Sequence, residues 1–221
     1  MTLAIVTYVP SGIVMASDSR QSMIVNTQNP QGEYFKTETV NSDAIDKTFL
    51  IERKQIGIST FGIDMLGNLP TARYISRFIE EELARADDIE TIPRKLYGYF
   101  QKRFPKANTG FHVAGYKIES GRAIPYVYYC DIANNIVERK NVKDDGSIVY
   151  GAIWSGVTDV IDYLLNPVII RDEEGNDKVI RAPSPIVWEM MSLQDAIDFS
   201  VYAIRTTIDT IRFQARPKNV G

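Results

Sequence analysis

The chain of 221 residues has little of what metal and redox sites require, because it contains one cysteine and one histidine. The single cysteine, Cys130, excludes an internal disulfide. With His112 as the one other soft ligand, a zinc site is not expected. We therefore expect chemistry that needs no metal and no organic cofactor.

Long apolar runs and an excess of charge of one sign are missing as well. Residues 3–9 (LAIVTYV) are too short to span a bilayer and lack the basic flank of a signal peptide. The 28 acidic and 25 basic residues leave a net charge of −3, which does not favour binding to nucleic acid or to an anionic membrane. We expect a cytoplasmic protein with no nucleic-acid and no membrane partner.

The chain does have enough apolar sequence for one well-formed core. Its length and its hydrophobic fraction of 44% predict a single domain over residues 1–221. Polar stretches near 26–46 and 166–184 interrupt the pattern, and we expect insertions at both. The first is expected to be a long loop, and the second a loop or a hairpin that turns at the sequence EEGN.

Runs of strands and runs of helices alternate along the sequence in blocks. Period-two patterns predict strands at 3–9, 12–18, 23–25, 47–52, 55–62, 110–118, 124–131, 136–139 and 147–153. Helical periodicity predicts helices at 70–86, 92–104, 157–165 and 192–213, the last capped by Ser192. Segregated blocks of this kind indicate the α+β class. Two antiparallel sheets, each covered by a helix pair, would form a four-layer αββα sandwich.

Thr2 is the first candidate for chemistry, because it opens the first predicted strand. Removal of Met1 would expose a threonine whose hydroxyl can attack a carbonyl while its own α-amine accepts the proton. We expect methionine aminopeptidase to remove Met1, because Thr2 is small. Threonine is common at the second position, so Thr2 alone does not indicate catalysis.

Asp18 and Lys47 can complete such a site, since each lies at the end of a predicted strand. A Lys47 ammonium near Thr2 would lower the pKa of both the amine and the hydroxyl. A buried lysine needs a carboxylate within hydrogen-bond reach, and Asp18 can supply one. An ordinary salt bridge between strand ends is the alternative interpretation.

These segments together resemble the proteasome β-type and HslV-like family of N-terminal-nucleophile (Ntn) threonine hydrolases. The resemblance is carried by Thr2 at the first strand, GIVMASDSR with Asp18, DKTFLI with Lys47, QIGISTFG, and the last helix SLQDAIDFSVYAIRTTID. It covers most of the chain. It implies that Thr2, Asp18 and Lys47 are catalytic.

The resemblance also implies supporting roles for other residues. Gly62 would offer an N–H to the oxyanion, and Ser22 and Gly62 would contact the bound peptide. Ser155 would lie near the Thr2 amine and Arg20 beside the nucleophile, and Asp209 is a further candidate. A strand-ending turn would also explain Gly62, and a helix cap would also explain Ser155.

Two departures from the family pattern concern this site. The last helix is followed by RFQARPKNVG instead of an RDxxSGG-like turn, which contributes an Asp and a Ser to the site in the family. Trp154 stands where the family usually has a small residue.

The sequence thus predicts a threonine-type endopeptidase that forms an acyl-enzyme on Thr2. The resemblance implies a self-compartmentalising homo-oligomer, built as a ring or a stacked assembly, that acts on peptides or unfolded proteins. An ATP-dependent unfoldase is an expected partner. Two alternatives stay open: a proteasome-like structural or assembly protein without turnover, and an Ntn amidase acting on a small amide. We expect His112 to be a strand residue with a local partner and Cys130 to be a small buried apolar residue.

Overall fold

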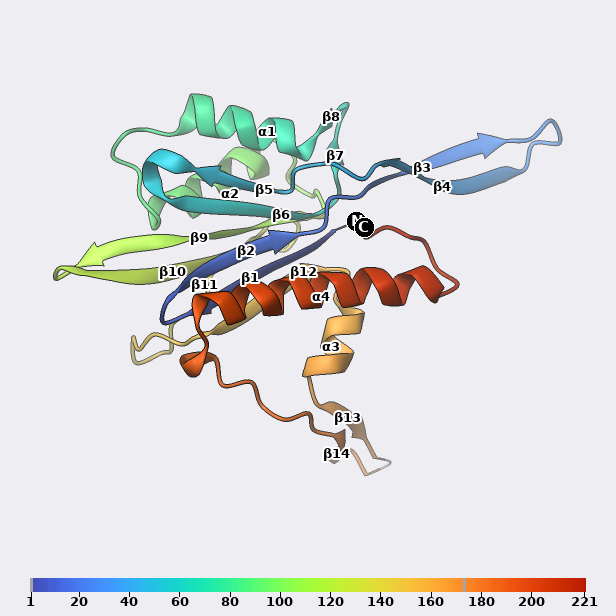
Figure 1. Cartoon of the computed structure of the whole chain (residues 1–221). Helices are drawn as coiled ribbons and strands as arrows, with labels where there is room; N and C mark the ends of the chain where they lie inside the picture. The colour runs from blue at the N-terminus through green and yellow to red at the C-terminus, as the bar shows by residue number, and fades with distance from the viewer. Residues whose placement is uncertain (1, 173) are drawn as a thin grey trace.

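Two antiparallel sheets form the body of the computed structural model, which describes residues 2–172 and 174–221 (Figure 1). The smaller sheet has the strand order β12-β1-β2, with β1 at Leu3–Val9, β2 at Gly12–Ser17 and β12 at Gly151–Gly156. The larger sheet has the order β11-β10-β9-β6-β5. Its strands are β5 (Thr48–Ile51), β6 (Ile56–Gly62), β9 (Thr109–Glu119), β10 (Arg122–Asp131) and β11 (Ile136–Arg139).

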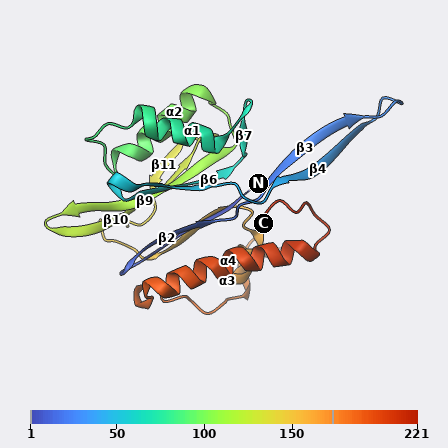
Figure 2. The same ribbon diagram turned by 45° about the horizontal axis from the view of Figure 1, so that its top comes forward.

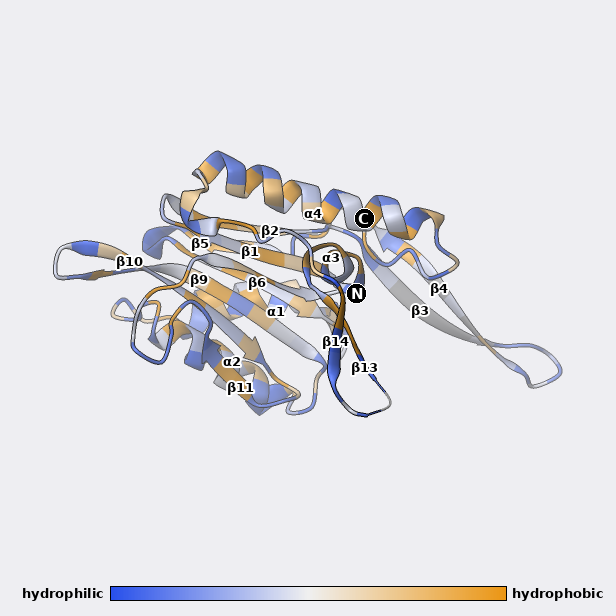
Figure 3. Ribbon diagram, turned by 90° about the horizontal axis from the view of Figure 1, so that it is seen from below, coloured by the Kyte–Doolittle hydropathy of each residue, from blue (hydrophilic) through white to orange (hydrophobic). Residues whose placement is uncertain are grey.

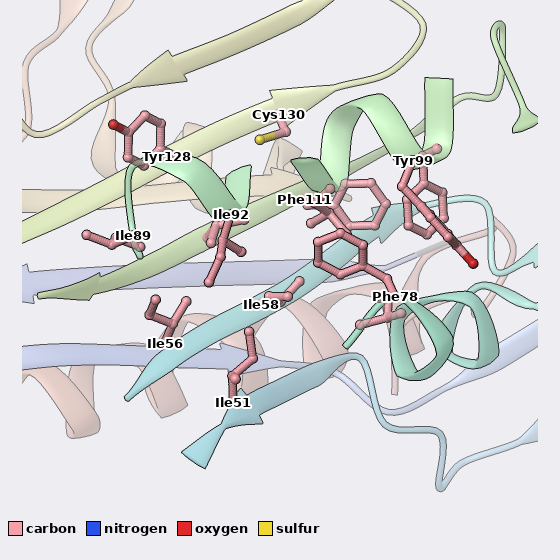
Figure 4. Close-up of a cluster of buried hydrophobic side chains, with 14 of the residues drawn as sticks. Ile51, Ile56, Ile58, Phe78, Ile89, Ile92, Tyr99, Phe111, Tyr128 and Cys130 are labelled. Atoms are coloured by element: carbon pink, nitrogen blue, oxygen red, sulfur yellow. The ribbon is translucent and has the colours of Figure 1, made fainter. Parts of the chain in front are cut away.

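The largest core cluster lies between the larger sheet and two helices (Figure 4). Helix α1 (Thr71–Arg77) continues into a π-helical turn, η2 (Phe78–Glu82), and α2 (Thr91–Arg103) follows. Phe100 from α2 packs on Phe111 from β9 with ring centroids 4.5 Å apart. The helix predicted to reach residue 86 ends at Glu82, because Leu83 is already extended.

The long helix α4 (Leu193–Phe213) covers the smaller sheet, and the short helix α3 (Asp159–Leu165) packs against α4 (Figures 1 and 2). Leu3 and Ile5 from β1 join Ala203 and Ile211 from α4 in a second buried cluster. The predicted N-cap is confirmed, since Ser192 forms a capping box with Asp195.

The two sheets meet through a small apolar cluster of Val6, Tyr8, Ala114 and Val127. All seven residues of β1 are buried, because alternate side chains face α4 and the larger sheet. Apolar residues run along β1 and β6 in the middle of the body (Figure 3). Strand β1 is therefore a central strand, and its first residues lie at one end of the space between the sheets.

Two hairpins extend from the body (Figures 1 and 3). Strands β3 (Gln21–Gln28) and β4 (Tyr34–Ser42) form the first, where the sequence predicted a long loop. Threonine-rich segments such as this one favour extended structure even without many aliphatic residues. Strands β13 (Val168–Arg171) and β14 (Asp177–Arg181) form the second hairpin, around the expected EEGN turn. The remaining short elements are η1 (Glu52–Lys54), β7 (Met65–Leu66), β8 (Leu69–Pro70) and η3 (Trp188–Met190).

The predicted four-layer αββα sandwich is wrong. The described residues divide their strands among five sheets of unequal size, and three of these have two strands each. Helices α1 and α3 have seven residues each, much shorter than the 21 residues of α4. The described residues are mostly β, with several small sheets and four α-helices. The blocks in the sequence indicated the order of elements, but the number of strands that join one sheet depends on long-range pairing. No helix in the described part of the chain is long and apolar enough to cross a bilayer.

Candidate active site

Asp18 is a buried carboxylate at the end of β2, and it accepts hydrogen bonds from backbone and side chain alike. The antiparallel β1–β2 pairing brings it beside Leu3, whose N–H donates to Oδ1 at 2.8 Å. The N–H of Arg20 donates to Oδ2 at 3.2 Å and that of Gly221 at 3.4 Å. Lys47 Nζ lies 3.2 Å from Oδ1 and 3.0 Å from Oδ2. Asp18 thus joins β1, the start of β3, the segment before β5 and the C-terminal residues.

Lys47 is 2% exposed and lies immediately before β5. Besides Asp18, its ammonium donates to the carbonyl of Arg20 at 2.5 Å. Burial raises the pKa of the Asp18 carboxyl above its usual range, while the Lys47 ammonium and the Leu3 N–H oppose that rise. The predicted contact between Asp18 and Lys47 is present, and their catalytic roles stay predictions.

Thr2 is fully buried at the start of β1. Its hydroxyl donates to Asp64 Oδ1 at 3.3 Å, and its carbonyl accepts the N–H of Val157 at 2.8 Å. The next residue, Leu3, binds the same Asp18 oxygen that Lys47 binds, so Thr2 lies beside the buried ion pair. Met1, whose removal the sequence predicts, lies outside the described residues, and its cleavage stays a prediction.

Asp64 is a site residue that the sequence patterns did not predict. It follows the strand-ending Gly62 by two residues, and the turn brings its carboxylate to the Thr2 hydroxyl. Gly62 has φ +93°, and a Cβ there would lie 2.2 Å from the carbonyl oxygen of Asn108. The tight turn that positions Asp64 therefore requires glycine. A carboxylate two residues after a strand-ending glycine was the signal available in the sequence.

Ser155 binds a histidine and does not cap a helix. Its Oγ lies 2.9 Å from Nε2 of His112, while α3 begins at Asp159 with Thr158 as its N-cap residue. The helix-cap interpretation is therefore wrong. His112 is fully buried, and burial lowers its pKa to about 3, which keeps the imidazole neutral. The predicted local partner of His112 is also wrong, because Ser155 lies in the other sheet.

Gly156 and Trp154 flank Ser155 in β12. Gly156 has φ +104°, and a Cβ there would lie 1.6 Å from the carbonyl oxygen of Thr2. Trp154 belongs to the cluster under α4, and its indole N–H donates to Asp162 at 2.8 Å. Because side chains alternate along a strand, Trp154 faces away from Ser155 and the space between the sheets. The large side chain of Trp154, which replaces the small residue usual in the family, therefore does not block the face of β12 on which Thr2 lies.

The segment after α4 contacts the residues around Asp18. The Ser19 N–H donates to the carbonyl of Gly221 at 2.9 Å, and Arg20 binds the carbonyl of Lys218 at 3.1 Å. Arg20 also pairs with Asp43 at 2.6 Å. The Lys218 ammonium in turn binds three carbonyls at the end of α4, which is favourable at a helix C-terminus. The RFQARPKNVG segment, noted in the sequence as a departure, therefore supports Asp18 directly.

Of the remaining candidates, Ser22 stays a prediction, Asp209 does not join this group, and Cys130 is inert. Ser22 lies at the base of the β3–β4 hairpin, opposite Val40. Asp209 is exposed on α4 and, within the described residues, has no hydrogen bond to Thr2 or Asp18. Cys130 is buried, and burial raises its pKa to about 12, so its thiol is a packing group. In residues 2–172 and 174–221, no three potential metal ligands come together.

Comparison with known proteins gives a likeness in fold. No family model matches the chain, and no curated protein matches it. Among solved structures it is similar to a mutant of Anbu from Hyphomicrobium sp. strain MC1, with a TM-score of 0.55 and 15% sequence identity. The alignment covers 100% of this chain and 78% of that chain. At this identity the likeness shows the fold alone.

The family predicted from the sequence is therefore wrong as an assignment. Short segments carried the resemblance to proteasome β-type and HslV-like hydrolases, and no family model recognises the chain. Anbu is proteasome-like, so the likeness supports a proteasome-like fold. It identifies no function and no catalytic residue.

Proposed function

We propose that the chain hydrolyses peptide bonds through Thr2 once Met1 has been removed. One observation carries this proposal. Oδ1 of Asp18 accepts hydrogen bonds from both the Lys47 ammonium and the N–H of Leu3, the residue next to Thr2. The Lys47 ammonium, which Asp18 holds beside Thr2, is a like charge that can lower the pKa of a free Thr2 amine. A neutral amine at physiological pH is what the reaction requires of its base.

The reaction follows from these groups. The Thr2 hydroxyl attacks the substrate carbonyl while the Thr2 amine takes its proton, and the oxyanion that forms can accept the N–H of Gly62. The amine then gives the proton to the leaving amino group, which leaves an ester on Thr2. Water attacks that ester with the same amine as base, which frees the acid product and restores the hydroxyl.

The proposal includes an assembly. A peptidase of this kind is safe in a cell when its sites are enclosed, so we propose a homo-oligomer, as a ring or stacked assembly, that takes peptides or unfolded proteins. Delivery of folded proteins into such an assembly would need an ATP-dependent unfoldase. The β3–β4 and β13–β14 hairpins extend from the body and offer surface for contacts between subunits.

Labelling with an α,β-epoxyketone tests the mechanism, because this reagent attaches to both the hydroxyl and the amine of an N-terminal threonine. We expect an intact mass without Met1, an adduct on Thr2, and cleavage of fluorogenic peptides. Thr2→Ser should keep part of the activity because it keeps the hydroxyl, and Thr2→Ala should lose it. Full activity in Thr2→Ala would overturn the mechanism.

One observation favours a second function, a structural or assembly protein without turnover. Thr2 is fully buried while residue 1 is present. If protein from cells keeps Met1 and takes up no epoxyketone, Thr2 is never freed and this second function is correct. Cleavage of small amides without cleavage of peptides would instead indicate the amidase alternative.

A further inference from the structure

His112 and Ser155 connect the two sheets, and the mechanism above uses neither of them. His112 comes from β9 in the middle of the larger sheet and Ser155 from β12 in the smaller one. Nε2 of His112 and Oγ of Ser155 lie 2.9 Å apart, and both residues are buried. Thr48 and Ser17 form another polar contact between the sheets, at 3.0 Å, but only the His112–Ser155 contact involves a titratable ring that is fully buried among the residues of these two contacts.

The β1–β12 ladder places Ser155 close to Thr2. Ser155 is directly opposite Ala4, and the carbonyl of Thr2 accepts the N–H of Val157. Side chains alternate along a strand, so Thr2 and Ala4 share the face of β1 on which Ser155 lies. Thr2 and Ser155 are thus diagonal neighbours, at about 7 Å or less between Cβ atoms.

The surroundings of His112 indicate which nitrogen carries the hydrogen. Within the described residues, Nδ1 is buried without a hydrogen-bond partner. An unpaired buried N–H is rarer in proteins than an unpaired acceptor, so the hydrogen belongs on Nε2 and Nδ1 keeps its lone pair. The low pKa of about 3 excludes His112 as a base for Ser155 at neutral pH.

We propose that His112 is a positioning residue whose Nε2–H donates to Ser155 Oγ, which leaves the Ser155 hydroxyl hydrogen to donate to the neutral α-amine of Thr2. The proposal rests on the proposed function, because it needs the free amine. A donor to the amine lone pair stabilises the neutral form and lowers the amine pKa. Without His112, the Ser155 oxygen is free to accept from the ammonium, which raises that pKa.

Other titratable groups face the same place and stay constant in the test. Asp18 after β2, Lys47 before β5 and Asp64 after β6 surround Thr2. Tyr129 from β10 lies beside His112, with ring centroids 6.1 Å apart. Substitutions of His112 leave these four side chains unchanged. A difference in pH profile between the His112 variants therefore reports on the contact with Ser155.

The pH dependence of kcat for a fluorogenic peptide tests the role in the full chain. In His112→Phe we expect the acidic limb to move to higher pH, so that kcat on that limb falls about 3- to 10-fold at a fixed pH. His112→Gln can place an amide donor near Nε2 and should restore the limb. Thr60→Val is the control, because it removes a buried hydroxyl that has no hydrogen-bond partner among the described residues. If the acidic limb of the pH profile is the same in His112→Phe and in the wild type, the positioning role of His112 is wrong.

A second measurement needs no turnover. The chain has one histidine, so ¹⁵N spectra of histidine-labelled protein report on His112 alone. We expect a neutral Nε2–H tautomer from pH 5.5 to 8.5, with an Nε2 resonance that shifts in Ser155→Ala. An Nδ1–H tautomer overturns the role even where the peptidase is active. If the wild type neither cleaves peptides nor takes up the epoxyketone, the proposed function fails and the role falls with it.

Discussion

The two buried polar pairs near Thr2 are stabilised in different ways. The charged pair, Asp18 and Lys47, is surrounded by backbone donors and an acceptor from three segments of the chain. The neutral pair, His112 and Ser155, makes one hydrogen bond and, within residues 2–172 and 174–221, leaves Nδ1 without a partner. Burying a charge costs far more than burying a neutral polar atom, so the ion pair needs a complete set of partners and the histidine does not.

Removing one charge should give the largest effect. Lys47→Ala leaves the Asp18 carboxylate buried without its counter-charge, and we expect it to lower the free energy of unfolding by about 3–5 kcal/mol. Urea denaturation measures the change. Arg171→Ala is the control, because its pair with Asp177 is exposed on both sides and contributes less than about 1 kcal/mol. Equal losses in the two variants would mean that the buried pair does not differ from a surface pair.

The second largest effect should be the loss of stability that the neutral pair causes at low pH. The pKa of His112 falls from about 6.5 in the unfolded chain to about 3 in the folded one, so its contribution is complete above pH 6.5 and is lost as the pH falls toward 3. Between pH 6 and pH 4 the wild type should lose about 1.4 kcal/mol per pH unit through this group. His112→Gln has no such group, and the difference between the two stability curves isolates it. Parallel curves would contradict the buried neutral histidine.

Removing both charges sharpens the comparison. Asp18→Asn with Lys47→Met keeps an acceptor for the Leu3 N–H and leaves no buried charge. We expect the double variant to recover about 2 kcal/mol of the loss in Lys47→Ala. Urea denaturation of the wild type, Lys47→Ala and the double variant gives the comparison, and a double variant no more stable than Lys47→Ala would show that charge is not the cause.

The smallest effect belongs to the serine. Ser155→Ala removes one neutral hydrogen bond and leaves Nε2 of His112 unpaired, and we expect a loss of about 1 kcal/mol. Thermal unfolding at pH 7 can resolve it against Ser184→Ala, which changes an exposed serine between β14 and η3. A loss as large as that of Lys47→Ala would remove the distinction between the two pairs.

Local patterns predicted part of this site. The contact between Asp18 and Lys47 followed from the charge-burial argument, and the capped helix after Ser192 followed from periodicity. Asp64 was missed because only the turn at Gly62 brings it to Thr2. The contact of Gly221 with Asp18 was missed because it joins residues 203 positions apart.

The sequence by itself determined the order of helices and of most strands, with β4, β7 and β8 missed. It also determined the ends of α2 and α4 to within a residue or two and the pairing of the two buried charges. These depend on side-chain periodicity, capping and the cost of an unpaired charge, which act over a few residues or on residue type alone. The tertiary structure decided how strands divide among sheets, and it decided that Ser155 binds His112 across the sheet interface. Such contacts depend on loop closure and on pairing between distant strands, for which one sequence carries no local signal.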